Sequence, residues 1–188
     1  MISPKNRKTI RLQGYDYSKN GWYFVTFCIK NFEERLGIIS DEGIFIPNEL
    51  GVITESEWKK IPNIRPNVEL DIFQIMPNHF HAIIVIGSKA NLPNIVRFPD
   101  TNNPIAEFKS PVKTIGSIIR GFKGASTKKI RLISNNLDDK IWQYNYFERI
   151  IRDENELNRI RQYIDRNPQK WQDDKEHFKK LLERMKKV

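Results

Sequence analysis

The stretch from Val68 to Ile86 constrains the fold most, because it holds two strand-like segments separated by a short turn. Residues 68–76 alternate between apolar and polar side chains, a Pro-Asn turn follows, and His79–Ile86 resumes the strand pattern. Its apolar part, Ala82–Gly87, is the longest apolar run in the chain, yet it is far shorter than the roughly 20 residues of a membrane span. We therefore expect a hairpin, or a kinked strand pair, whose second strand is buried.

The rest of the chain adds strands and helices in an order that predicts an α+β fold. β-Branched and aromatic residues predict a central strand over Gly21–Lys30, and short strands are expected at 36–40 and 43–47. Helical spacing of apolar residues predicts helices over 48–60 and 111–132 and from Asp153 to Pro168, with a further strand over 141–151. Residues 88–110 predict an exposed loop. This order predicts helices packed against an antiparallel sheet.

Length and composition fit one domain. The chain has 188 residues and 39% hydrophobic content, enough to bury a core. We expect residues 1–171 to form this domain and residues 172–188 to form a charged helical tail. The single cysteine, Cys28, cannot form an internal disulfide, and neither a secretory signal nor a membrane span is evident. A cytoplasmic protein with no membrane partner is expected.

A net charge of +9 points to a polyanionic partner, of which nucleic acid is the obvious one. The basic residues gather in the N-terminal arm and on the polar side of the predicted helix 111–132. The side chains expected to contact DNA phosphates are Lys5, Arg7, Lys8, Arg11, Lys113, Arg120, Lys123, Lys128, Lys129 and Arg131. For each of them a solvated charged face is the alternative. Exposed Tyr15, Tyr17 or Tyr144 would be able to stack on unpaired bases.

Two of the three histidines, His79 and His81, lie two residues apart on a predicted strand. Side chains at i and i+2 project from the same face, close enough to share one metal ion. Neutral imidazole is a common metal ligand. The alternative is a pair of buried histidines satisfied by hydrogen bonds, so a third ligand is needed to favour metal binding.

The last predicted helix offers such a ligand. Tyr163 and Asn167 are four residues apart and share one helix face, so the Asn167 carbonyl would be able to complete a metal site at which the tyrosine hydroxyl points. The alternative is a half-buried core tyrosine and a helix C-cap before proline. Tyr144 and Tyr146 are competing tyrosines close to Glu148, which either assists at the site or forms a surface ion pair.

Several segments together carry a resemblance to a known family. They are Met76–His81, Trp142-Gln143, Ile151–Asp153, Tyr163–Pro168, Arg11–Tyr17 and Gly116–Lys123. In this order and spacing they resemble the REP-associated tyrosine transposases, which are related to the small single-tyrosine HUH insertion-sequence transposases. The resemblance spans residues 11–171, nearly the whole chain.

The resemblance implies a ferredoxin-like (RRM-like) antiparallel sheet with helices packed on it. By matching position, His79 and His81 would hold a divalent ion, Mg²⁺ or Mn²⁺, and Tyr163 would be the nucleophile. Asn167 would stand where insertion-sequence relatives carry a glutamine, which is one methylene longer. The implied activity is cleavage and rejoining of single-stranded or hairpin DNA through a 5′-phosphotyrosine bond, without ATP. The implied partner is a palindromic repeat with a flanking single-stranded guide, bound by a monomer or a homodimer.

Two other functions fit the same residues. A conjugative relaxase or a rolling-circle replication initiator nicks DNA with a similar histidine pair and tyrosine, although such proteins are usually larger. A basic ferredoxin-like module would bind RNA or DNA without cutting it.

Overall fold

The structure, a computed structural model, describes residues 19–87 and 114–171. The N-terminal arm, the whole of the predicted loop 88–110 and the predicted tail 172–188 lie outside the described residues. The domain boundary after residue 171 therefore stays a prediction. None of the described helices is long and apolar enough to cross a membrane.

The central sheet has four antiparallel strands. They are β1 (Gly21–Cys28), β4 (Val68–Ile75), β5 (His79–Ile86) and β6 (Phe147–Ile151), which lie side by side in the order β4-β5-β1-β6. Helix α1 (Glu49–Lys59) comes between β1 and β4, and α3 (Ile115–Ser134) comes between β5 and β6. This β-α-β-β-α-β order with this arrangement of strands is the ferredoxin-like fold, so the predicted fold class is confirmed. The predicted hairpin is β4 and β5.

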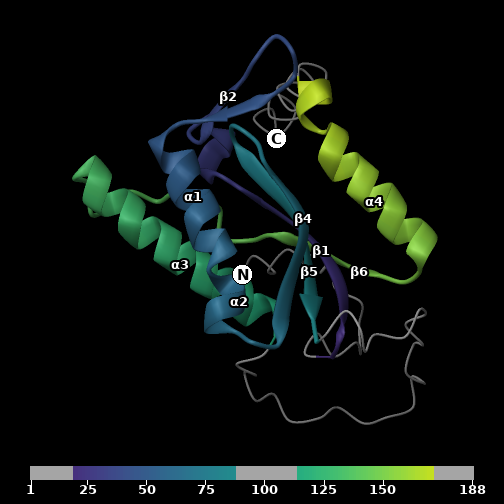
Figure 1. The fold of residues 1–188 in the computed structure, drawn as a ribbon. Helices are drawn as coiled ribbons and strands as arrows, with labels where there is room; N and C mark the ends of the chain where they lie inside the picture. Colours follow the sequence, from purple (N-terminus) through teal and green to yellow (C-terminus); the bar gives the residue numbers. More distant parts are fainter. Residues whose placement is uncertain (1–18, 88–113, 172–188) are drawn as a thin grey trace, which may run out of the picture.

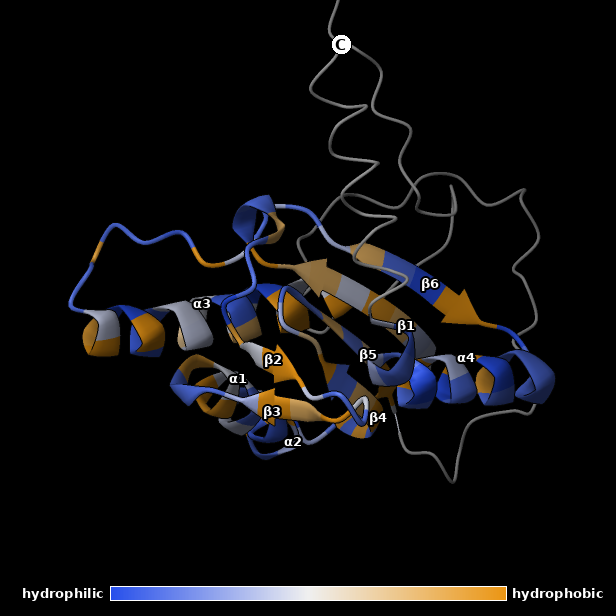
Figure 2. Cartoon of the chain, turned by 90° about the horizontal axis from the view of Figure 1, so that it is seen from above, coloured by the Kyte–Doolittle hydropathy of each residue, from blue (hydrophilic) through white to orange (hydrophobic). Residues whose placement is uncertain are grey.

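Helices cover the two faces of the sheet. Figure 1 and Figure 2 show α1 and α3 side by side on one face and α4 (Glu154–Arg166) on the other. Successive side chains of a strand point to opposite faces, so Val25 joins the core under α1 and α3, whereas Phe24 joins the core under α4. Trp58 of α1 packs on Phe80 at the centre of the first core, with ring centroids 4.7 Å apart.

Helix α4 lies over β4 and β5, near the end of the described residues. Asp153 caps its first turn by accepting a hydrogen bond from the Glu156 amide at 2.8 Å. Ile164 is fully buried in the core that contains Phe24. An ion pair between Arg161 and Asp71 of β4, 2.5 Å long, fixes the helix against the sheet. These contacts determine which side chains of α4 reach β5.

Several predicted boundaries differ from the observed ones. The strand β1 ends at Cys28 and a short 3-10 helix, η1 (Lys30–Phe32), follows it. Helix α1 ends near the predicted point, but α2 (Ile61–Ile64) follows with Pro62 in its first turn, where the missing N–H of proline costs nothing. Within the predicted helix 111–132, α3 begins after its N-cap Thr114. The predicted short strands are β2 (Gly37–Ile39) and β3 (Phe45–Pro47), which form their own two-stranded sheet.

The predicted strand 141–151 is largely irregular before Phe147. Trp142 forms only an isolated bridge with Ile29. Its indole N–H donates to the Ser126 hydroxyl of α3 at 2.9 Å, so this segment is held by packing into the core rather than by a strand ladder. After α4, the described part of the chain continues through another 3-10 helix, η3 (Pro168–Lys170), to Trp171.

Two helical glycines are expected to respond to alanine with opposite signs. A Cβ on Gly51 of α1 would lie 2.1 Å from the Leu36 carbonyl oxygen, which is backbone and cannot move freely. We expect Gly51→Ala to lower the free energy of unfolding by about 2 kcal/mol, although alanine is the better helix former. A Cβ on Gly124 of α3 would meet nothing within 4 Å, so Gly124→Ala should raise that free energy by about 0.5–1 kcal/mol. Urea unfolding of both variants measures the two signs. Equal signs would contradict the packing of α1 against Leu36.

Candidate functional site

Two buried imidazoles lie next to each other on β5, facing α4. His79 is 3% exposed and His81 is 5% exposed, and their ring centroids are 4.6 Å apart. The register pairs His79 with Cys28 and His81 with Thr26 of β1. The two histidines, called the imidazole pair below, therefore share one face of the sheet, as their spacing predicts.

A hydrogen bond orients each ring through its Nδ1 atom. The Asn78 Oδ1 atom lies 2.6 Å from Nδ1 of His79, and the Thr26 hydroxyl lies 2.7 Å from Nδ1 of His81. An amide oxygen only accepts, so Nδ1 of His79 carries the hydrogen and its Nε2 atom keeps a lone pair. The Asn78 amide is fixed in turn, because its nitrogen donates to the Phe32 carbonyl at 3.2 Å. A Thr26 oxygen that accepts from His81 gives the same tautomer there.

Burial keeps both imidazoles neutral. Desolvation lowers the pKa of His79 to about 4, while the nearby Asn167 amide acts in the opposite direction. The pKa of His81 is lowered well below its usual value, first by burial and then by the neighbouring His79. At neutral pH the pair therefore offers lone pairs, the form in which imidazole binds a metal.

Tyr163 reaches the imidazole pair from α4. Its hydroxyl oxygen lies 3.2 Å from Nε2 of His81, and the two rings pack edge to face with centroids 5.1 Å apart. The side chain is 46% exposed, so the hydroxyl lies where the buried pair meets solvent. Nε2 of His81 cannot accept a hydrogen from the tyrosine and give the same lone pair to a metal, so these two arrangements exclude each other.

Asn167 lies one helical turn after Tyr163 and is 1% exposed. It is the C-cap residue of α4, as the alternative interpretation of the sequence predicts. Its backbone N–H donates to the Ile164 carbonyl, while its side chain is buried beside His79. A side-chain hydrogen bond to Asn167 acts to raise the pKa of His79, but within residues 19–87 and 114–171 neither the amide oxygen nor the amide nitrogen has a partner at normal hydrogen-bond geometry. A buried amide without partners is costly, and a metal-bound oxygen would explain it.

A metal site made by these side chains would have few protein ligands. Within residues 19–87 and 114–171, no group of three or more His, Cys, Asp or Glu side chains could hold a metal ion. A divalent ion placed here would have two imidazole nitrogens, from His79 and His81, and the amide oxygen of Asn167. Its other positions would go to water or to substrate oxygens, which suits a catalytic site better than a closed structural one.

The competing tyrosines do not join this site. Glu148 is paired with Val25 in the sheet, so it points to the face covered by α1 and α3. The Tyr146 hydroxyl donates to Glu148 at 2.9 Å on that same face. Tyr144 is 94% exposed and precedes β6. The idea that Glu148 assists Tyr163 is therefore wrong.

Sequence reasoning missed four residues around the imidazole pair. Thr26 and Asn78 orient the rings, Phe24 stacks on His81 with centroids 5.7 Å apart, and Trp171 covers His79 at 6.0 Å. One signal was available for Thr26, because it is a polar residue inside an otherwise apolar strand.

The predicted DNA-binding cations of α3 fall into two groups. Arg120 and Lys128 are exposed. The others bind the protein itself: Lys129 pairs with Glu57 at 2.5 Å, Nε of Arg131 donates to the Asp139 carbonyl at 2.8 Å, and Lys123 donates to the carbonyls of Gln143 and Asn145 at 2.8 and 3.2 Å. Lys5, Arg7, Lys8, Arg11 and Lys113 lie outside the described residues. Helix α3 packs on the face of the sheet opposite the imidazole pair.

Comparison with known proteins gives a relative and a fold. A protein of Haemophilus influenzae strain Rd, itself uncharacterised, is 40% identical over 173 residues, which cover 90% of this chain and 92% of the relative. No protein-family model matches the chain. A REP-associated tyrosine transposase solved with a REP hairpin has a TM-score of 0.55 and 20% identity, over 85% of this chain and 73% of that one. A candidate transposase of Deinococcus radiodurans is 17% identical over 82% of this chain and 95% of its own, but its TM-score of 0.44 is too low to support an argument.

Proposed function

Because the chain belongs to the same family as the Haemophilus influenzae protein and has the fold of a REP-associated tyrosine transposase, we propose that it is a tyrosine transposase. It cleaves and rejoins single-stranded or hairpin DNA with the help of a divalent metal. The observation that carries this proposal is the Tyr163 hydroxyl at 3.2 Å from Nε2 of His81, on the same helix face as the buried Asn167 amide.

His79, His81 and Asn167 would hold the metal ion, Mg²⁺ or Mn²⁺. When bound, such an ion polarises a phosphate and stabilises the negative charge of the transition state. The chain's own contribution is the orientation of the ligands. Thr26 and Asn78 fix the imidazole rings, and the burial of the pair excludes water and keeps the nitrogens unprotonated.

Tyr163 supplies the nucleophile. Its hydroxyl oxygen forms a bond to phosphorus while the bond from phosphorus to the 3′ oxygen breaks, so that the tyrosine proton is lost and the 3′ oxygen gains one. The products are a 5′-phosphotyrosine and a free 3′-hydroxyl. Because one phosphoester replaces another, attack by a 3′-hydroxyl on the phosphotyrosine rejoins the strand without ATP.

The substrate proposed for this site is a hairpin with an unpaired flanking segment. The REP-associated transposase of similar fold was solved with a REP hairpin bound. The positive charge of this chain fits such a ligand, and a protein that acts on DNA in the cytoplasm needs no membrane contact. All four side chains of the site come from one copy of the chain, so the proposal requires no second copy.

Covalent capture tests the proposal. Protein incubated with Mg²⁺ and a 5′-labelled hairpin that carries an unpaired flank should cleave it, and a label placed downstream of the cut should remain on the protein after denaturation. Binding should be tighter for this hairpin than for plain duplex and should weaken steeply with salt. A protein that binds the hairpin but gives neither product nor adduct would be a non-catalytic binding module instead.

Removal of the Asn78 side chain is expected to weaken metal binding. Asn78→Ala leaves Nδ1 of His79 without its acceptor, so the ring can adopt the wrong tautomer or orientation, and Mn²⁺ affinity should fall ten- to a hundredfold. Asn78→Asp keeps an oxygen acceptor and should retain most of the affinity. Isothermal titration with Mn²⁺ measures both variants. Equal losses in both would mean that Asn78 acts through the fold rather than through His79.

A further inference from the structure

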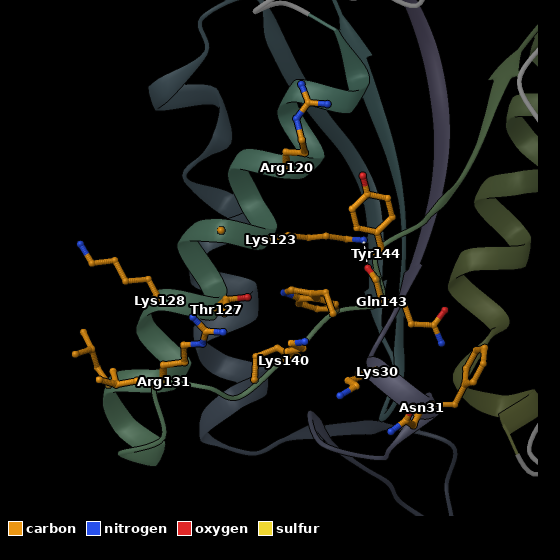
Figure 3. Close-up of a pocket in the computed structure, with 16 residues that line it drawn as sticks. Lys30, Asn31, Arg120, Lys123, Thr127, Lys128, Arg131, Lys140, Gln143 and Tyr144 are labelled. Atoms are coloured by element: carbon orange, nitrogen blue, oxygen red, sulfur yellow. Dashed lines mark hydrogen bonds between the residues drawn. The ribbon is translucent and has the colours of Figure 1, made fainter. Parts of the chain in front are cut away.

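A groove of about 1190 Å³ lies on the α3 side of the sheet (Figure 3). One wall is α3 from Arg120 to Leu132, and the other is formed by residues of the segment 137–144, which leads towards β6. Residues 30–32, which follow β1, complete the lining. We call it the basic groove, because six of its sixteen lining residues are Lys or Arg and none is Asp or Glu. An anionic ligand fits such a surface best.

Only some of these cations are available to a ligand. Lys123 holds two backbone carbonyls, and burial lowers the pKa of its ammonium to about 8. Arg131 holds the Asp139 carbonyl. Arg120, Lys128 and Lys140 are exposed and make no ion pair within the described part of the chain. The charge that remains for a ligand is therefore spread along the groove.

Tyr144 adds a flat apolar surface to the basic groove. It is 94% exposed, which is unusual for a tyrosine in an ordered segment. The segment is held in place, since the ammonium of Lys123 donates to the Gln143 carbonyl (Figure 3) and also to the Asn145 carbonyl, on the two sides of Tyr144. An exposed ring on a fixed backbone, with cations around it, is the arrangement that stacks an unpaired base and neutralises its phosphates.

The basic groove and the imidazole pair lie on opposite faces of the sheet, near the same end of β1. Cys28 is paired with His79, and the chain continues from there into Lys30–Phe32, which line the groove. The Phe32 carbonyl also accepts the hydrogen bond of Asn78, whose other amide atom orients His79. The groove and the imidazole pair therefore flank the same end of β1, on opposite faces of the sheet.

We infer that the basic groove binds an unpaired segment of a nucleic acid, with one base stacked on Tyr144 and phosphates on Arg120, Lys128 and Lys140. This inference rests on the proposed function, because it names where the unpaired part of the DNA substrate lies. A paired stem hides its base faces, so the stem does not use Tyr144. An acidic peptide would satisfy the cations but not the exposed ring.

Binding measurements on a hairpin with and without an unpaired tail test the groove. The Tyr163→Phe background prevents cleavage, EDTA removes metal, and fluorescence anisotropy reports affinity. Tyr144→Ala should weaken binding of the tailed hairpin about tenfold and leave binding of the blunt hairpin unchanged, whereas Tyr144→Phe keeps the ring and the affinity. Lys140→Ala should reduce the slope of log affinity against log salt by about 0.7, the value for one phosphate of a single strand. Lys59→Ala, an equal loss of charge on α1 away from the groove, should not change that slope.

Three results would overturn the proposal that the basic groove binds an unpaired strand. They are a Tyr144→Ala protein that binds the tailed hairpin as tightly as its parent, a parent that gains nothing from the tail, and an acidic peptide that competes for the groove better than an unpaired strand. The proposed function is judged separately, by covalent capture of DNA on the protein with Tyr163 intact. If the adduct forms and Tyr144→Ala does not weaken binding of the tailed hairpin, the transposase proposal stands and the proposed role of the groove is refuted.

Discussion

Tyr163→Phe is expected to abolish cleavage and covalent capture of DNA while leaving the fold intact. The substitution removes only a hydroxyl, and the ring keeps its edge-to-face contacts with His81 and Phe24, whose centroids lie 5.1 and 6.2 Å away. Loss of one partly exposed hydrogen bond should change the free energy of unfolding by about 1 kcal/mol or less. Cleavage should fall by at least about 10³-fold, because a missing nucleophile has no substitute. Denaturing gels of labelled DNA measure both the product and the adduct.

Two matched variants control for the loss of a tyrosine hydroxyl elsewhere. Tyr144→Phe and Tyr146→Phe remove the same atom from residues that do not face the imidazole pair, so both proteins should still form the adduct. Mass spectrometry of the wild-type adduct should place the DNA on the peptide that contains Tyr163. A label on Tyr144 or Tyr146 would move the active site to the other side of the sheet. Cleavage by Tyr163→Phe would refute the phosphotyrosine mechanism.

Local periodicity predicted the parts of the fold that depend on burial. The hairpin of β4 and β5 and the buried side of α3 follow directly from the spacing of apolar residues. The segment 141–146 has the aromatic composition of a strand, but Trp142 and Lys123 tie it to α3 instead. The irregular structure of this segment depends on contacts between residues distant in the sequence, which a local sequence pattern does not reveal.

The candidate site was predictable only within each element. A period of two places His79 and His81 on one face, and a spacing of four places Tyr163 and Asn167 on another. That these two faces meet depends on α4 packing over β4 and β5, which the Arg161–Asp71 ion pair helps to fix across 90 positions. Thr26 was missed for the same reason, because 55 positions separate it from His81.

Charge was the least predictable property at the level of single residues. A lysine that binds phosphate and a lysine that binds its own protein look alike in a sequence. Lys129 lies one residue from Lys128, yet Lys129 pairs with the buried Glu57 carboxylate, and Lys128 projects outward from α3 (Figure 3). Lys140 was not singled out, because the segment around it gives no helical pattern.

Replacement of the imidazole pair is expected to abolish metal-dependent cleavage. A variant with both His79→Ala and His81→Ala loses two of the three proposed protein ligands. Its Mn²⁺ affinity should therefore fall by more than about 10²-fold, which exceeds the loss expected for Asn78→Ala, where only a hydrogen-bond partner of a ligand is removed. Cleavage in Mg²⁺ or Mn²⁺ should disappear with it. Binding of the tailed hairpin in EDTA should persist, because the basic groove lies on the other face of the sheet. Titration calorimetry, cleavage gels and anisotropy measure the three quantities on one preparation.

The alanine variant leaves a cavity where two buried rings pack against Phe24 and Trp171, so its stability must be measured with its activity. His79→Leu with His81→Leu fills more of that space and offers no atom that binds a metal. If burial and packing were the only role of the imidazoles, the leucine variant would recover cleavage as its thermal stability recovered. If the imidazoles bind the metal, stability returns and cleavage does not, since leucine has no lone pair to give to the ion. A folded leucine variant that cleaves as the wild type does would refute the metal site, even if the adduct on Tyr163 were already established.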